Sequence, residues 1–166
     1  MARIGNALRG LSVTGLPAST LLYLLNRLVC SDESPERVAS AAVFVLDQDR
    51  PALRWAQAGH PPPVLVSGGA ARLLARPSGL LLGAVPTAQY DLGEEELAAG
   101  DVLFLYTDGL IEQRGESIVD VLREFVATLG PPHGQELTAA AQADQILANA
   151  VSDTEDDACL VAVRIR

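Results

Sequence analysis

The side chains in this sequence best suited to chemistry are carboxylates and one histidine in three short segments. These segments are Gly59-His60, Asp108-Gly109 followed by Glu112, and Asp156-Asp157. Asp108 follows one apolar run and Asp156 precedes another, so both carboxylates are expected at the ends of buried strands. Oxygen ligands suit Mg²⁺ or Mn²⁺, and Mg²⁺ commonly rests on one or two carboxylates and keeps several waters. Asp108 and Asp156 are therefore candidate metal ligands.

The same residues also have a purely structural interpretation. Asp-Gly is a common turn dipeptide, and an acid-rich loop such as residues 152–157 is commonly just solvated. Spacing alone does not decide between a turn and a metal site.

The absence of lysine removes several kinds of enzyme from consideration. All 12 basic residues are arginine, so a Walker A loop, a Schiff-base lysine and a kinase strand lysine are excluded. His60 and His133 are the only histidines, and neither lies in H-E-x-x-H or near a cysteine at zinc-ligand spacing. No G-x-S-x-G occurs either, which argues against a serine nucleophile on an elbow turn.

Length and charge bound the remaining possibilities. A chain of 166 residues suits one domain over 1–166, and its net charge of −9 disfavours nucleic acid and anionic membranes as partners. No run approaches the ~18 apolar residues of a membrane span. Cys30 and Cys159 form no C-x-x-C and lie in apolar stretches, so we expect buried, reduced thiols and a cytoplasmic protein.

Hydrophobic periodicity predicts two helices followed by strands in the first half of the chain. Apolar residues at three- and four-residue spacing predict a helix over 1–11, and a wide apolar stripe after Pro17 predicts another up to about residue 29. Residues 40–46 and a run starting at Leu53 predict a hairpin. Because prolines cannot donate ladder hydrogen bonds, the triple proline 61–63 predicts that strand 64–66 starts at a sheet edge or a bend.

The second half predicts a buried strand between acidic turns and two further helices. The acidic triplet 94–96 is expected to be solvated surface, and residues 102–106 form a continuous apolar run typical of a buried strand. Helices are predicted from Ser117 to Leu129 and over 136–151, with a final strand over 158–165. Helices, strands, helices and a strand in this order indicate an α+β layer architecture.

Four strings in this order resemble the SpoIIE-like branch of the metal-dependent protein phosphatase (PPM) superfamily. They are residues 56–62 (AQAGHPP), 79–83 (GLLLG), 100–112 (GDVLFLYTDGLIE) and 156–161 (DDACLV). The third string is the most specific. In the fourth, Cys159 stands where Thr or Ser is usual in the family.

The resemblance implies an α-β-β-α sandwich that hydrolyses phosphoserine or phosphothreonine with two Mn²⁺ or Mg²⁺ ions and their bridging water. It implies Asp108 and Asp156 as catalytic metal ligands and Asp157 as a further ligand. Supporting positions are Gly59, His60, Gly109 and Glu112. His60 falls where many relatives carry an Asp near an accessory metal, so both ligation and a structural role are open. The implied partner is a phosphorylated regulatory protein of the anti-sigma factor antagonist type.

One departure from the family pattern lies at the start of the chain. The family's first metal motif should precede the first helix, whereas residues 1–9 resemble the helix that follows it. We therefore expect the C-terminal portion of such a domain, without its first strands and with weak or absent activity as isolated. The alternative is a non-catalytic, protein-binding member of the same fold. Unpaired strand edges favour association, so a homodimer is also expected.

Overall fold

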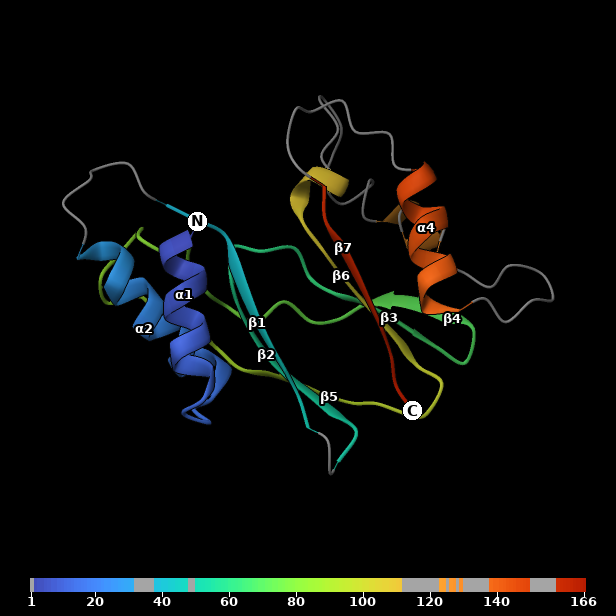
Figure 1. Ribbon diagram of the computed structural model, residues 1–166, viewed down its shortest axis with the longest axis horizontal. Coiled ribbons are helices and arrows are strands. Elements are labelled where there is room, and N and C mark those ends of the chain that lie inside the picture. The colour runs from blue at the N-terminus through green and yellow to red at the C-terminus, as the bar shows by residue number, and fades with distance from the viewer. Residues whose placement is uncertain are drawn as a thin grey trace. The chain divides into compact units, whose positions relative to one another are not determined.

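A computed structural model describes residues 2–31, 38–47, 50–111, 123–124, 126–127, 129, 138–149 and 158–166. These residues form two compact units (Figure 1). The first unit comprises Met1–His60 and Arg76–Glu96, and the second comprises Pro61–Ala75 and Leu97–Arg166.

The first unit is a three-stranded antiparallel sheet with two helices packed on it. Its elements are α1 (Ala2–Ser12), α2 (Ala18–Cys30), β1 (Ala41–Leu46), β2 (Ala52–Ala58) and β5 (Gly93–Glu96). The strand order is β1-β2-β5. α2 packs on β1 and β2, and α1 packs on α2. Both predicted helices and the predicted β1-β2 hairpin are confirmed.

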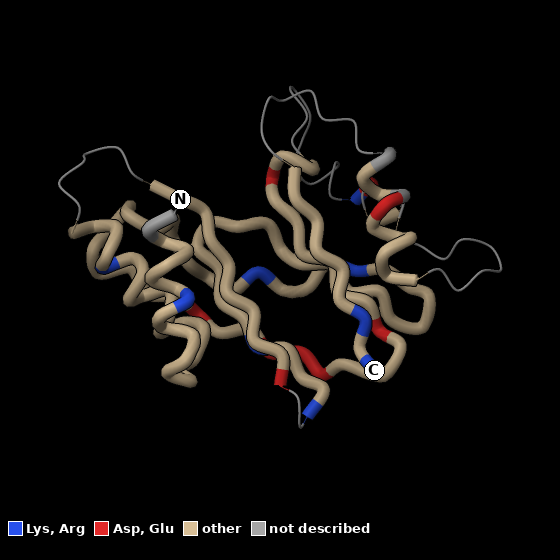
Figure 2. Tube along the Cα trace, viewed as in Figure 1, with Lys and Arg blue, Asp and Glu red and all other residues tan. Residues whose placement is uncertain are grey.

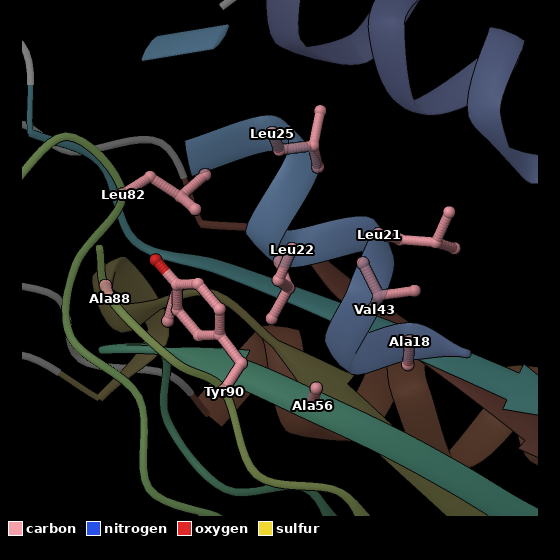
Figure 3. Close-up of a cluster of buried hydrophobic side chains, with 10 residues drawn as sticks. Ala18, Leu21, Leu22, Leu25, Val43, Ala56, Leu82, Ala88 and Tyr90 are labelled. Atoms are coloured by element: carbon pink, nitrogen blue, oxygen red, sulfur yellow. The ribbon is translucent and has the colours of Figure 1, made fainter. Parts of the chain in front are cut away.

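The core of the first unit joins the apolar stripe of α2 to one face of the sheet and to the loop after Gly79. Figure 3 shows the buried side chains Ala18, Leu21, Leu22, Leu25, Val43, Ala56, Leu82, Ala88 and Tyr90. Leu22 and Leu82 are completely buried. Such packing of an amphipathic helix, more than intrinsic helix propensity, stabilises a helix of this length.

The acidic triplet 94–96 lies on the surface, as predicted, but it also forms the strand β5. Glu94 and Glu96 are exposed as expected, but β5 pairs with β2 in register from Trp55↔Gly93 to Ala52↔Glu96. Charged residues occur on both units (Figure 2). Between β2 and β5, Arg54 Nε donates to Glu94 Oε1 at 3.0 Å. Strand pairing and this ion pair override the low strand propensity of glutamate.

The second unit is a four-stranded antiparallel sheet with strand order β4-β3-β6-β7. Its elements are β3 (Val64–Ser67), β4 (Ala70–Leu73), β6 (Val102–Tyr106), the short 3₁₀ helix η1 (Asp108–Leu110), α4 (Ala139–Asn149) and β7 (Leu160–Arg164). α4 packs on β7. The predicted buried strand and the predicted final strand are confirmed, and α4 lies inside the helix predicted over 136–151.

Of the two alternatives for the strand after the prolines, a sheet edge or a bend, the sheet edge is wrong. β3 lies between β4 and β6, and Val64 is fully buried. The prolines precede β3, so the ladder loses no hydrogen bond through their missing N–H groups. Their carbonyls serve as acceptors. Pro63 O accepts from Leu74 N at 2.9 Å, and Pro62 O accepts from the Tyr106 hydroxyl at 2.7 Å.

The expected burial of both cysteines is also wrong. Cys30 is half-buried at the end of α2, whereas Cys159 is exposed just before β7. Both thiols are free. The predicted helix from Ser117 to Leu129 falls mostly outside the described residues, although 123–124 and 126–127 are helical. Over the described ranges, no helix is long and apolar enough to span a membrane.

A glycine contact in the first unit yields a stability prediction. A Cβ on Gly93 would lie 2.6 Å from Cε2 and Cζ2 of the Trp55 indole. Gly93→Ala is therefore expected to lower the free energy of unfolding by about 1–3 kcal/mol through overpacking. Trp55 is the only tryptophan, so urea unfolding followed by its fluorescence measures this directly.

The matched control is Gly10→Ala on α1, where an added Cβ meets no atom within 4 Å. This change should leave stability unchanged or raise it by up to about 1 kcal/mol, because alanine favours helix. An equal loss of stability in both variants would contradict the contact between Gly93 and the indole.

Candidate metal centre

Asp108 lies where the buried strand β6 meets the surface. The residues of β6 are buried apart from half-buried Leu105, and Gly109 to Ile111 after it are buried again. Asp108 itself is exposed and begins η1, and its Oδ1 accepts a hydrogen bond from Gly109 N at 3.2 Å. A carboxylate thus faces solvent from a buried strand and a buried turn.

Thr107 joins the end of β6 to the beginning of β7. Its N–H donates to Cys159 O at 3.0 Å, and its Oγ1 accepts from Cys159 N at 2.9 Å. These bonds continue the β6-β7 ladder one pair beyond Tyr106↔Leu160. The residue before Asp108 is therefore tied to the residue two positions after Asp157.

Tyr106 attaches the proline segment to the same strand. Its side chain is buried, and its hydroxyl donates to Pro62 O at 2.7 Å. Burial raises the pKa of Tyr106 well above its usual value, because the phenolate would lose its hydration. Tyr106 and Thr107 thus connect the strand before Asp108 to two other segments of the second unit.

At the opposite end of β6, the Gly-Asp pair that opens the same motif has a structural role. Gly100 has a φ of +96°, and buried Asp101 accepts from Ala98 N at 2.8 Å through Oδ2. Ile165 N donates to Asp101 O at 2.9 Å. Asp101 therefore stabilises a turn that precedes β6.

Gly59 and His60 lie in the first unit, in a tightly packed loop. Gly59 has a φ of +69°, and an added Cβ would overlap the Leu81 side chain. Gly59 N donates to Gly79 O at 3.2 Å, which joins the 56–62 and 79–83 segments. His60 is half-buried with Nδ1 3.4 Å from Ser40 Oγ. Gly59 is required here for backbone geometry.

A buried amide that was not predicted from the sequence organises this loop. Asn26 on α2 is completely buried, accepts from Gly83 N through Oδ1 at 2.8 Å and donates to Val85 O through Nδ2 at 2.8 Å. The signal available in the sequence was an asparagine between Leu25 and Leu28 in an apolar stripe. A buried amide in such a place needs hydrogen-bond partners.

The predicted site residues fall into three groups. Asp108 and Gly109 lie in the second unit, and Gly59 and His60 in the first. Glu112, Asp156 and Asp157 lie outside the described residues. Within the described ranges no cluster of three or more His, Cys, Asp or Glu side chains could hold a metal. The exposed carboxylate of Asp108 has the oxygen donors that Mg²⁺ and Mn²⁺ prefer.

Comparison with known families and structures supports a phosphatase fold. The sequence profile of the family described as Stage II sporulation protein E (SpoIIE) matches residues 1–166. The RsbU and RsbW domains of Rv1364c from Mycobacterium tuberculosis superpose with a TM-score of 0.86 at 26% identity. That match covers 100% of this chain and 48% of that one. The chain thus spans about half the length of that structure.

Two more distant structures share the fold. The manganese-presoaked phosphatase domain of SpoIIE from Bacillus subtilis has a TM-score of 0.59 at 18% identity, covering 95% of this chain and 70% of that one. RsbX in complex with magnesium has a TM-score of 0.68 at 14% identity, covering 97% and 70%. The predicted α+β fold of PPM phosphatase type is confirmed.

The buried tyrosine beside the candidate site predicts a loss of stability at alkaline pH. Because Tyr106 has a raised pKa in the folded state, its contribution is complete below about pH 10, the usual pKa, and is lost as the pH rises further. Above pH 10, the free energy of unfolding of the wild type should fall more steeply than that of Tyr106→Phe. The difference between the two slopes should be about 1.4 kcal/mol per pH unit. At pH 7 the variant should be about 1 kcal/mol less stable, because Pro62 O loses its donor.

Urea unfolding from pH 8 to 11 measures both effects, and the lack of lysine leaves few other groups that titrate near pH 10. Tyr90→Phe is a useful companion, since burial foremost and the nearby Cys30 raise the pKa of Tyr90. The double variant should have the shallowest pH dependence. Parallel curves for wild type and Tyr106→Phe would refute the assignment.

Proposed function

Because the chain belongs to the SpoIIE family, we propose that it is a metal-dependent serine/threonine phosphatase domain whose metal centre includes Asp108. Its catalytic carboxylates are Asp108 and Asp156, with Asp157 as a further ligand and Gly109, Glu112, Gly59 and His60 in support. The reaction is hydrolysis of a phosphoserine or phosphothreonine ester by water.

The observation that carries this proposal is the contrast between Asp108 and the other residues of its motif. Tyr106 bonds to Pro62, Thr107 bonds to Cys159, and Asp101 stabilises a turn. Asp108 is exposed, and among the described residues its carboxylate has only the short contact from Gly109 N. An exposed carboxylate on a rigid support is suited to hold a cation without reorganising.

The chain length between Asp156 and Cys159 supports a shared site. Asp156 precedes Cys159 by three residues, so its Cα lies within about 11 Å of that of Cys159 by covalent reach alone. Cys159 is hydrogen-bonded to Thr107, the neighbour of Asp108. The two carboxylates can therefore serve one centre.

Mn²⁺ or Mg²⁺ is the proposed cofactor, consistent with oxygen donors and with the manganese and magnesium named for two structural relatives. When bound, such an ion supplies an activated water and offsets the negative charge of the phosphoryl group. The chain's own part is to orient Asp108 at the end of β6. Its surrounding strands and the turn η1 keep that carboxylate at the surface.

The proposed substrate is a phosphorylated regulatory protein of the anti-sigma factor antagonist type, in the cytoplasm. The support is the family match and the RsbU and RsbW domains of the M. tuberculosis relative. The proposed assembly is a homodimer, since unpaired strand edges favour association.

The test is Mn²⁺-dependent hydrolysis of p-nitrophenyl phosphate and of a phosphoserine peptide, together with thermal melts. An ion bound at 100 times its Kd should stabilise the folded chain by about 2.7 kcal/mol. Asp108→Asn should abolish both this stabilisation and hydrolysis while keeping the melt without metal. Asp91→Asn, at an exposed position of the first unit, is the matched control and should respond to Mn²⁺ like the wild type.

The outcomes separate the two candidate functions. Turnover by the wild type that Asp108→Asn removes would support the phosphatase, whereas stabilisation without turnover fits both the weak activity expected of this portion and the non-catalytic, protein-binding alternative. Unchanged Mn²⁺ stabilisation in Asp108→Asn would reject Asp108 as a ligand.

A further inference from the structure

The hydroxyl of Thr107 occupies a place that a backbone carbonyl normally fills. In an antiparallel ladder, the two residues of a hydrogen-bonded pair exchange both N–H···O bonds. Thr107 N donates to Cys159 O, but Cys159 N donates to Thr107 Oγ1 instead of to the Thr107 carbonyl. That carbonyl accepts from Leu110 N at 3.0 Å.

Because the hydroxyl takes the bond from Cys159 N, the Thr107 carbonyl is left to accept from Leu110 N. The bond from Leu110 N to Thr107 O closes the first turn of η1, the turn that carries Asp108. The bond from Cys159 N keeps the beginning of β7 beside the end of β6. Without a hydroxyl at 107, either the turn opens or the Cys159 N–H loses its protein partner.

We propose that Thr107 is a positioning residue for the metal centre. Its hydroxyl lets β6 turn into η1 at Asp108 while β7 stays in register, so that the carboxylate of Asp108 is held at the end of the sheet. The inference rests on the proposed function in treating Asp108 as a metal ligand. It goes beyond that function in assigning the relative placement of the two strand ends to one side-chain oxygen.

The same geometry accounts for the cysteine at position 159. The contacts with Thr107 use the backbone N–H and C=O of Cys159, and its thiol is exposed. The hydrogen bonds therefore place no demand on the side chain there. A cysteine can stand where the family usually has Thr or Ser without disturbing the junction.

The experiment compares Thr107→Val, which keeps the shape and removes the hydroxyl, with Thr107→Ser, which keeps the hydroxyl. Mn²⁺ affinity is measured from melts over a range of Mn²⁺ concentrations. Thr107→Val should raise the Kd for Mn²⁺ about 10-fold or more, as expected when a group that orients a ligand is lost. Thr107→Ser should stay within about twofold of the wild type.

Thr14→Val is the matched control in the first unit. Thr14 Oγ1 also makes side-chain bonds to backbone, donating to Leu11 O at 2.6 Å. This variant should melt slightly lower without metal but keep the wild-type Kd for Mn²⁺. This control shows whether a small loss of stability by itself changes the Kd for Mn²⁺.

A second route removes the other partner of the same bond. Cys159→Pro lacks the N–H and sits just before the first residue of β7, where proline is tolerated, whereas Cys159→Ser keeps the N–H. Cys159→Pro should weaken Mn²⁺ binding as Thr107→Val does, and the double variant should be no weaker than either single one. Cys159→Ser should bind Mn²⁺ like the wild type.

Three results would overturn the inference. They are wild-type Mn²⁺ affinity in Thr107→Val, an equal loss in Thr107→Ser, and additive losses in the double variant. If the wild type shows no response to Mn²⁺, the proposed function fails and the positioning role fails with it. Hydrogen exchange at the Cys159 amide, expected slow in wild type and Thr107→Ser and fast in Thr107→Val, distinguishes that case from failure of the hydrogen bond itself.

Discussion

The antiparallel register between β6 and β7 is the constraint on which the candidate site depends. It runs from Val102↔Arg164 to Tyr106↔Leu160 and is extended by Thr107 and Cys159. A slip of one residue would move Cys159 away from Thr107 and turn the side chains of β7 to the other face of the sheet. Because strand ends inherit the register of their ladder, this pairing determines which residues meet where Asp108 enters solvent.

Several described residues of the family-like strings have structural tasks. Gly59 supplies a positive φ beneath Leu81, and Gly79 packs so closely on the Gln57 carbonyl that no side chain would fit. Tyr106 and Asp101 satisfy backbone groups. These residues build the two sheets and their loops, and among the described carboxylates of the strings Asp101 is buried and Asp108 is exposed.

In both units, polar side chains supply hydrogen-bond partners to backbone groups of distant segments. In the first, the buried amide of Asn26 joins α2 to the loop after Leu82, where backbone groups would otherwise lack partners. In the second, side-chain oxygens of Tyr106 and Thr107 bond to backbone atoms of distant segments. Each of these bonds joins residues far apart in sequence, so each depends on the whole unit being folded.

The sequence by itself determined α1, α2, the β1-β2 hairpin, β6 and β7, because hydrophobic periodicity and turn residues act locally. The motif strings likewise identified the family and placed Asp108 at the end of a strand. Only the tertiary structure made the acidic triplet a strand, placed β3 inside its sheet and exposed Cys159. It alone revealed the roles of Asn26 and Thr107. The pairings and hydrogen bonds behind these features join residues more than 35 positions apart, and no local pattern encodes which partner a hydrogen-bonding group will find.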